Sequence, residues 1–321
     1  MTDELELRLD SLAGVGPVTT RKLNDAGIQN IMDLIVRGPV EIAELTGMDI
    51  DSSSKICEKA REDLVKGGLI AKDFISASEL YKKRQTIGMI TTGTDALDTL
   101  FAGGIETQAL TEVYGEFGCG KTQFCHTMCV QVQKPKAEGG LEGGVLYMDS
   151  ENTFRPERIK SMAEGYGLDP KEVLSKIHVG RAYNSDQQML MVDKALELAT
   201  KHPIKLLGID SLTSAFRAEF LGRGTLAERQ QKIRAHMRDL DKFMEGTNAA
   251  TVVTNQVHSN PQAMFGDPTK PVGGHIVGHT SKFRIYLRKG KAGTRVCRLK
   301  DSPHLPESEA VISILEEGIR D

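Results

Sequence analysis

An eight-residue segment of the chain has the residue types and spacing of a phosphate-binding loop. The segment Gly115-Glu116-Phe117-Gly118-Cys119-Gly120-Lys121-Thr122 reads G-x-x-x-x-G-K-[ST] and lies between a β-type run and a helix-type run. Its glycines allow backbone N–H groups to turn inward around a polyphosphate, and the following helix directs its positive dipole end to the same anion. Lys121 can reach the β- and γ-phosphates, and the Thr122 hydroxyl can ligate Mg²⁺. The segment therefore predicts a site for a nucleoside triphosphate with Mg²⁺.

Three further polar residues each come shortly after a β-type run. Asp210 ends an apolar run, an arrangement that places a carboxylate beside Mg²⁺ and opposite Thr122. Glu151 can reach a water that attacks the γ-phosphate, and the Gln256 amide can sense that phosphate. A single carboxylate in this position is often a helix cap, but parallel strands end at the same edge of a sheet, where these groups would meet. Together they predict hydrolysis of the bound nucleotide.

The elements that would position these groups follow from an alternation of β-type and helical runs after Thr86. The β-type runs are residues 109–114, 145–148, 176–179, 205–209 and 250–254, and the helical runs include 123–133, 185–200 and 226–245. Such alternation predicts an α/β fold with a twisted, mostly parallel sheet and helices on both faces. Two later β-type runs flank Gly290-Lys291-Ala292-Gly293 and predict a hairpin, which would add an antiparallel edge.

The chain before this core divides into a helical unit, residues 1–66, and an aperiodic linker, residues 67–85, ahead of an ATPase core at 86–321. Leu12-Ala13-Gly14-Val15-Gly16 has the h-x-G-h-G pattern of a helix-hairpin-helix turn, whose exposed N–H groups suit a DNA phosphate. A second copy begins at Leu45, with Asp49 in place of the second glycine. Two interpretations stay open, DNA contact and a purely packed helical domain.

Composition sets outer bounds on the function. The formal net charge of −3 and the pI near 6.3 give no global attraction to nucleic acid, so DNA contact would need local basic surface. The five cysteines are odd in number and form no CxxC pair, which predicts a reducing compartment without a disulfide framework or a zinc site. No apolar run reaches membrane-spanning length and the N-terminus is acidic. We therefore expect a cytoplasmic protein without membrane association.

Longer motifs resemble the RecA-fold family of strand-exchange recombinases, above all its archaeal members, over nearly the whole chain. These motifs occupy residues 115–123, 154–158, 181–186, 226–231, 273–279 and 301–306. The resemblance implies a RecA-like core with a small all-α helix-hairpin-helix domain before it. It also implies a DNA-dependent ATPase that binds single-stranded and double-stranded DNA, assembles as a ring or a helical filament, and catalyses homologous pairing and strand exchange in recombination and repair.

The resemblance assigns roles around the nucleotide. Glu151 would polarise the attacking water, Lys121 would hold the phosphates of ATP, and Gln256 would couple the γ-phosphate to a DNA-binding loop. Arg158 is similar to the residue that packs near adenine in the family. The segment from Asp301 to Pro306 looks like the cap that closes over ATP bound to a neighbouring subunit, and the family can also bind a monovalent cation such as K⁺ near Asp301.

Assembly and DNA contact are implied in the same way. Phe74-Ile75-Ser76-Ala77 matches the family's F-x-x-A polymerisation motif, in which Phe74 and Ala77 would fill pockets on the next subunit; alternatively Phe74 packs on its own core. The segment 216–224 resembles the first DNA-binding loop, and the second would run from about 257 to 273. The implied DNA ligands are Arg217, Arg223, Arg229 and Gly274. Arg229 could instead pair along its own helix.

Two features of the sequence carry open alternatives. Residues 281–300 contain eight Lys or Arg and no acid, which is typical of a solvated hairpin face, although a filament axis lined with them would attract DNA. Cys119 stands where the family often has Ser and would add a liability to oxidation or alkylation.

Two rival functions share the phosphate-binding loop. A hexameric RecA-fold helicase would need neither the F-x-x-A motif nor the cap at 301–306. An ATP-gated adaptor that regulates a recombinase would not need Glu151 together with both DNA-binding loops.

Overall fold

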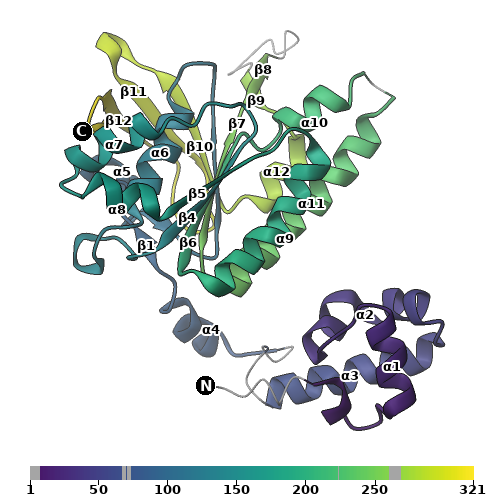
Figure 1. Cartoon of the computed structure of the whole chain (residues 1–321). Helices are drawn as coiled ribbons and strands as arrows, with labels where there is room; N and C mark the ends of the chain where they lie inside the picture. Colours follow the sequence, from purple (N-terminus) through teal and green to yellow (C-terminus); the bar gives the residue numbers. More distant parts are fainter. Residues whose placement is uncertain (1–7, 67–69, 71–73, 223, 260–268) are drawn as a thin grey trace. The chain divides into compact units, whose positions relative to one another are not determined.

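The structure, a computed structural model, describes residues 8–66, 70, 74–222, 224–259 and 269–321. The chain divides into two compact units, residues 1–85 and residues 86–321 (Figure 1). Each unit has its own apolar core. None of the described helices combines the length and apolar character that crossing a membrane requires.

The first unit is a small bundle of helices. Its elements are the 3₁₀ helix η1 (Leu9–Ser11), α1 (Pro17–Asp25), α2 (Ile31–Thr46), α3 (Ile50–Lys66) and α4 (Ala77–Arg84). Leucine and isoleucine side chains of η1 to α3 bury one another, among them Leu12, Leu23 and Leu34. Asp49, which departs from the hairpin pattern, accepts a hydrogen bond from the Ser52 N–H at 2.8 Å and so caps the start of α3.

Helix α4 lies inside the segment that the sequence predicted to be an aperiodic linker. Ser76 and Glu79 form a reciprocal capping box at its start, and the basic residues Lys82, Lys83 and Arg84 occupy its last turn. No residue of α4 is buried, so the helix lacks the apolar stripe by which sequence periodicity detects a helix. Local capping and charge therefore favour this helix where hydrophobic patterning gave no signal.

Within the part of the chain that the structure describes, the second unit is built on a nine-stranded sheet in the order β13-β12-β11-β10-β3-β7-β6-β4-β5. Pairs from β10 through β5 are parallel, and β10 to β13 pair antiparallel. This confirms the mostly parallel sheet with an antiparallel edge. The strands are β3 (Leu110–Tyr114), β4 (Gly144–Asp149), β5 (Ile177–Arg181), β6 (Ile204–Asp210), β7 (Ala250–Asn255), β10 (Phe283–Lys289), β11 (Arg295–Asp301), β12 (Ser308–Leu315) and β13 (Gly318–Arg320).

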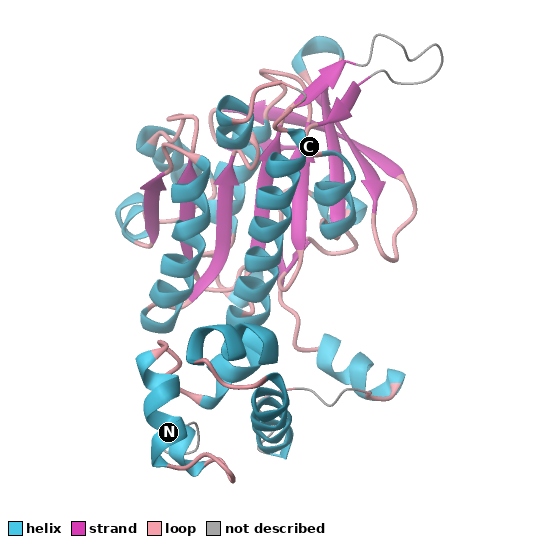
Figure 2. Cartoon of the chain, turned by 90° about the vertical axis from the view of Figure 1, so that its right-hand side faces the viewer, coloured by secondary structure: helices cyan, strands magenta, loops and turns pink. Residues whose placement is uncertain are grey.

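Helices cover both faces of this sheet. One layer, with a core around Phe124 and Met128, contains α5 (Asp95–Leu100), α6 (Lys121–Gln131), α7 (Pro156–Gly165) and α8 (Pro170–Ser175). The opposite layer, with a core around Phe216 and Phe243, contains α9 (Ser185–Lys201), α10 (Ser214–Glu219), α11 (Leu226–Thr247) and α12 (Gly274–Thr280), and Figure 2 shows the long helices of this layer in front of the strands.

Short elements complete the unit. They are the paired strands β1 (Met89–Ile90) and β2 (Ile105–Glu106), the ribbon β8 (Val257–Ser259) with β9 (Thr269–Pro271), and the 3₁₀ helices η2 (Lys136–Glu138) and η3 (Lys291–Gly293). Strands β3, β4 and β7 are buried along their whole length, as expected of strands covered on both faces. Because β3, β4, β6 and β7 run parallel, the polar residues that follow them gather at one edge of the sheet.

Candidate nucleotide site

The phosphate-binding loop connects β3 to α6, as the sequence predicted. Gly120 precedes α6 with φ of +113°, and a Cβ built there would lie 2.2 Å from Cδ1 of Ile314 on β12. A Cβ at Gly115 would lie 2.1 Å from the carbonyl oxygen of Leu287 on β10. Glycine is therefore required at both ends of the loop, by backbone conformation and close approach at Gly120 and by close approach at Gly115.

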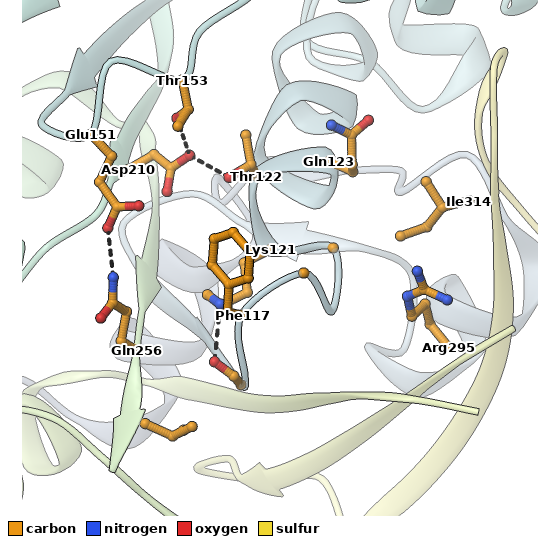
Figure 3. Close-up of a pocket in the computed structure, with 14 residues that line it drawn as sticks. Phe117, Lys121, Thr122, Gln123, Glu151, Thr153, Asp210, Gln256, Arg295 and Ile314 are labelled. Atoms are coloured by element: carbon orange, nitrogen blue, oxygen red, sulfur yellow. Dashed lines mark hydrogen bonds between the residues drawn. The ribbon is translucent and has the colours of Figure 1, made fainter. Parts of the chain in front are cut away.

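The loop borders a cavity of about 400 Å³ at the carboxyl edge of the sheet (Figure 3). The cavity brings together nearly all the residues that the sequence assigned to phosphate and water. It is lined by Gly115, Phe117, Gly118, Gly120, Lys121, Thr122, Gln123, Glu151, Thr153, Asp210, Gln256, Val257, Arg295 and Ile314. Phe117 is 95% exposed, so its ring stands at the mouth of the cavity rather than in the core.

Lys121 spans the loop from inside the cavity. Its Nζ donates hydrogen bonds to the carbonyl oxygens of Gly115 at 3.0 Å and Glu116 at 2.9 Å. The ammonium group is thereby held where the backbone N–H groups of the loop and the start of α6 favour an anion. Polyphosphate oxygens would be stronger acceptors for this cation than neutral carbonyls, so the site fits a nucleotide.

Asp210, which the sequence predicted to lie beside Mg²⁺, lines the cavity. This carboxylate is only 2% exposed, and its Oδ2 accepts hydrogen bonds from Thr122 Oγ1 at 2.7 Å and Tyr147 OH at 3.1 Å, while Oδ1 accepts from Thr254. Hydroxyl donors offset the cost of burying the charge. Thr122 and Asp210 supply the oxygen donors that suit Mg²⁺, which takes only one or two protein ligands beside phosphates and water. The described residues hold no cluster of three or more His, Cys, Asp or Glu around another metal position.

A tight turn after β4 carries Glu151. The buried Asp149 carboxylate accepts hydrogen bonds from the backbone N–H groups of Glu151 at 3.1 Å, Thr153 at 3.1 Å and Phe154 at 3.0 Å. Glu151 Oε1 in turn accepts from Ser211 Oγ at 2.7 Å and from Gln256 Nε2 at 3.0 Å. Glu151 and Gln256, which the sequence placed after different strands, therefore lie in direct contact.

Gln256 also contacts the first predicted DNA-binding loop. Arg217, an exposed residue of α10, donates from Nη1 to Gln256 Oε1 at 2.8 Å. A continuous path of hydrogen bonds thus joins Arg217, Gln256 and Glu151 at the rim of the cavity.

The rings of His126, Tyr147 and Phe154 form a cluster next to residues that line the cavity. The His126 ring, one helical turn after Thr122, lies 5.5 Å from the Tyr147 ring and 5.2 Å from the Phe154 ring, measured between centroids. Burial lowers the pKa of His126 to about 4, so the ring is neutral at physiological pH. Burial likewise raises the pKa of Tyr147 above its ordinary value.

Cys119 does not carry the chemical liability that the sequence suggested. The side chain is fully buried beneath the loop, and desolvation raises the pKa of its thiol. Because the thiolate is the reactive species and reagents need access to it, Cys119 is protected on two counts. All five cysteines are free and buried.

Other residues that the sequence assigned to the site lie outside the lining of this cavity. Arg158 bonds through Nε to Gln123, which lines the cavity, at 2.6 Å, and through its Nη atoms to the backbone carbonyls of Leu315 and Glu316. Asp301 and Pro306 are exposed residues at the end of β11 and in the segment that follows it.

The residues predicted to bind DNA have separate positions in the second unit. Arg229 lies in the first turn of α11, and Gly274 is the first residue of α12 with φ of +60°. Arg223 and residues 260–268 of the second predicted loop lie outside the described residues.

Four of the eight basic residues in segment 281–300 form salt bridges within the chain, namely Arg284, Arg288, Arg298 and Lys300. Arg284 forms a salt bridge of 2.7 Å with the buried Glu112, Arg298 forms one of 2.9 Å with Glu307, and Arg288 lies 3.7 Å from Glu309. The sequence could not show these pairs because the carboxylates lie outside the segment, Glu112 on β3, Glu309 on β12 and Glu307 just before β12.

Arg295 and Ile314 are lining residues that the sequence reading missed. Arg295 Nε donates to the carbonyl oxygen of Cys119 in the loop at 2.8 Å, and Ile314 packs against Gly120. Arg295 was visible only as one of many cations in a hairpin. The position of Arg295 could have been inferred from strand pairing. Arg295 begins β11, β11 pairs with β10, and β10 pairs with β3, the strand before the phosphate-binding loop.

The parallel sheet, the phosphate-binding loop between β3 and α6, and the carboxylate at the end of β6 define a P-loop nucleoside triphosphatase of the RecA-like class. Residues 83–321 match the Rad51 family, and residues 6–62 match the SAM-like helix-hairpin-helix tandem. The chain therefore belongs to the Rad51 family.

Two relatives show the extent of this similarity. The chain is 57% identical over 317 residues to the DNA repair and recombination protein RadA of Cenarchaeum symbiosum (strain A), which covers 98% of this chain and 79% of that protein. It is 48% identical over 329 residues to the DNA repair and recombination protein RadA of Methanocorpusculum labreanum, with 98% of each chain covered.

Proposed function

We propose that this protein is a strand-exchange recombinase of DNA repair and recombination, a DNA-dependent ATPase that assembles on single-stranded DNA. The observation that carries the proposal is the cavity that brings Lys121, Thr122, Asp210, Glu151 and Gln256 together in a chain of the Rad51 family. The cavity supplies phosphate binding, metal ligands, a base and an amide sensor within one site.

Hydrolysis follows from the roles of these side chains. Lys121 binds the β- and γ-phosphates of ATP, and Thr122 and Asp210 hold Mg²⁺, which when bound neutralises charge on the phosphate oxygens. Glu151 orients a water and accepts its proton as that water attacks the γ-phosphate. Gln256 contacts Glu151 and directly precedes the second DNA-binding loop in the chain. A change at the γ-phosphate would therefore reach that loop through Gln256.

The DNA side of the proposal uses the rim next to Gln256. Arg217 and Arg223 of the first loop would neutralise phosphates of single-stranded DNA. Arg229, which follows the first loop in sequence, and Gly274, which follows the second, would add contacts to the DNA. Contacts of this kind read the backbone rather than the bases, which suits a protein that must bind any sequence.

Assembly is supported by an exposed anchor and by an open receiving site. Phe74 is 94% exposed, which disfavours the alternative that it packs on its own core. In the second unit, the edge strand β5 borders an apolar cavity of about 290 Å³ with Val179, Met191 and Leu198 in its lining. We propose that Phe74 and Ala77 of one copy fill this cavity and its rim on the next copy.

The nucleotide would then lie between subunits. Asp301 and Pro306 are exposed and do not line the cavity of their own chain, as a cap over a neighbour's ATP requires. The proposal extends to K⁺ beside Asp301, because its carboxylate offers oxygen atoms to a hard cation.

Electron microscopy of the protein with ATP and single-stranded DNA, combined with a strand-exchange assay, tests this function. We expect continuous helical filaments and exchange that requires ATP. Closed hexamers that unwind duplexes would favour the helicase, and assemblies without exchange would favour the adaptor.

The variant Phe74→Glu tests the assembly contact. An unpaired charge in an apolar pocket should weaken each interface by about 2 kcal/mol or more, so light scattering should detect monomers and the DNA-stimulated ATPase should be lost. Leu80→Glu places the same charge on the exposed helix α4 and serves as the control. An unchanged oligomer of Phe74→Glu would show that Phe74 is no interface anchor.

A further inference from the structure

The path of hydrogen bonds at the rim of the cavity fixes the direction of the Gln256 side chain. Arg217 Nη1 donates to Gln256 Oε1 at 2.8 Å, and Gln256 Nε2 donates to Glu151 Oε1 at 3.0 Å. A guanidinium can only donate and a carboxylate can only accept, so these partners determine which end of the amide faces which neighbour. Gln256 is therefore held at both ends.

Glu151 is held by the same path. Its Oε1 accepts from Gln256 Nε2 and from Ser211 Oγ, which lies 2.7 Å away. In Figure 3 a dashed line joins the Glu151 carboxylate to the Gln256 amide, and Asp210 lies beside Glu151. The bond to Gln256 therefore ties the proposed base to the residue that contacts Arg217.

We propose that Arg217 is a positioning residue that restrains Glu151 through Gln256 when no DNA is bound, and that a DNA phosphate releases the restraint by taking Arg217. The inference rests on the proposed DNA-dependent ATPase and adds a second role to a residue assigned there only to DNA contact. In this scheme one guanidinium has two competing acceptors.

The competition favours the phosphate. Arg217 is exposed and contacts the neutral amide oxygen of Gln256 through Nη1. A phosphate presents charged oxygens to which a guanidinium can donate two parallel hydrogen bonds, and this bidentate ion pair is stronger than one bond from the guanidinium to a neutral oxygen. When Arg217 turns to DNA, Gln256 Oε1 loses this donor, and the amide can rotate toward the γ-phosphate, which leaves Glu151 with the hydrogen bond from Ser211 Oγ alone.

The test is the ATPase rate measured without DNA. Arg217→Met keeps an unbranched side chain but removes every donor, so the basal rate should rise roughly tenfold, the factor that corresponds to about 1.4 kcal/mol. Arg217→Lys restores a donor and should bring the basal rate back toward that of the unaltered protein. Arg234→Met removes an exposed cation from α11 and is the matched control, with an unchanged basal rate expected.

A double-mutant cycle separates positioning from an indirect effect on the fold. If Arg217 acts through Gln256, then Arg217→Met should not change the basal rate of a Gln256→Ala protein. An additive increase in that background would overturn the inference, as would a basal rate of Arg217→Met equal to or below that of the unaltered protein.

Failure of this inference and failure of the proposed function have different signatures. If single-stranded DNA stimulates the unaltered protein but Arg217→Met leaves the basal rate unchanged, only the restraint is wrong. If DNA does not stimulate the unaltered protein, the proposed function is wrong and the restraint falls with it.

Discussion

The two walls of the nucleotide cavity are built differently. The wall of Lys121, Thr122 and Asp210 rests on the loop between β3 and α6, and its carboxylate is buried and bonded to hydroxyl groups. The second wall consists of Glu151 and Gln256, which are tied to each other and to the exposed Arg217, with Ser211 as a further donor to Glu151. One wall is fixed by packing and the other by a few exchangeable hydrogen bonds.

This difference suggests how one site can both bind a nucleotide and transmit the presence of that nucleotide to the DNA-binding loops. A buried network resists change because breaking it leaves unsatisfied groups in a low-dielectric environment. Exposed hydrogen bonds are exchanged at small net cost because water or a new partner replaces them. We therefore propose that the packed wall binds the nucleotide and that the exchangeable wall signals its presence.

The largest expected effect is on the packed wall. Lys121→Ala removes the cation that the loop directs at the β- and γ-phosphates, so DNA-stimulated ATPase activity should fall by orders of magnitude. A thermal melt should show that the fold persists. Lys136→Ala, an exposed lysine of η2, is the control, and equal activity in Lys121→Ala and the unaltered protein would remove the basis of the site assignment.

Acid should weaken the second unit in both of its helix layers, through His126 on α6 and His236 on α11. Burial lowers the pKa of His126 and of His236 to about 4, against 6.5 for an ordinary histidine. Between pH 6.5 and 4 the unfolded chain binds protons that the folded chain does not, so stability is present above pH 6.5 and is lost as the pH falls. At pH 5 each ring should cost about 2 kcal/mol.

The variant His126→Phe checks this prediction. The ring nitrogens of His126 are buried and form no hydrogen bond with any described residue, and aromatic rings surround them, so phenylalanine should be accommodated. Denaturant unfolding at pH 7.5 and pH 5 should show a smaller loss of stability for the variant than for the unaltered protein. Equal losses in the two proteins would contradict the pKa assignment.

The smallest expected effect is on the exchangeable wall. Gln256→Ala should leave ATP affinity without DNA nearly intact and should abolish the mutual enhancement of ATP and DNA binding, a coupling of about 1 kcal/mol at the lower end of typical values. Fluorescence anisotropy of labelled single-stranded DNA, with ADP and with a non-hydrolysable ATP analogue, measures this coupling.

Gln231→Ala on α11 is the control for that measurement. If Gln256→Ala keeps the full nucleotide-dependent gain in DNA affinity, the signal must pass through the subunit interface. The comparison of the two walls would then lose its functional meaning.

Local signals explain what the sequence predicted. The strands β3, β4, β6 and β7 lie in β-type runs that the sequence showed, and polar residues that follow parallel strands must meet at one edge of the sheet. The loop motif fixed Lys121 and Thr122 by spacing alone. The hairpin of β10 and β11 was visible because Gly290 to Gly293 separate two β-type runs.

What the sequence did not predict depends on contacts between distant segments. Arg295 reaches the Cys119 carbonyl only because β11 folds back beside β10, and Arg217 meets Gln256 only because β6 and β7 are neighbours. Neither contact leaves a periodic trace in the sequence. Helix α4 was missed for a local reason, because only its capping box and the basic residues of its last turn mark it and it has no apolar periodicity.

The packing of Ile314 against Gly120 has a consequence for how the protein is made. A ribosome releases the phosphate-binding loop long before it synthesises β12, so a growing chain has the loop without the side chain that packs on it. Arg158 must likewise wait for the carbonyls of Leu315 and Glu316. The packing around this loop is therefore complete only after β12 has been made, so a partly synthesised subunit lacks the finished geometry of the nucleotide site.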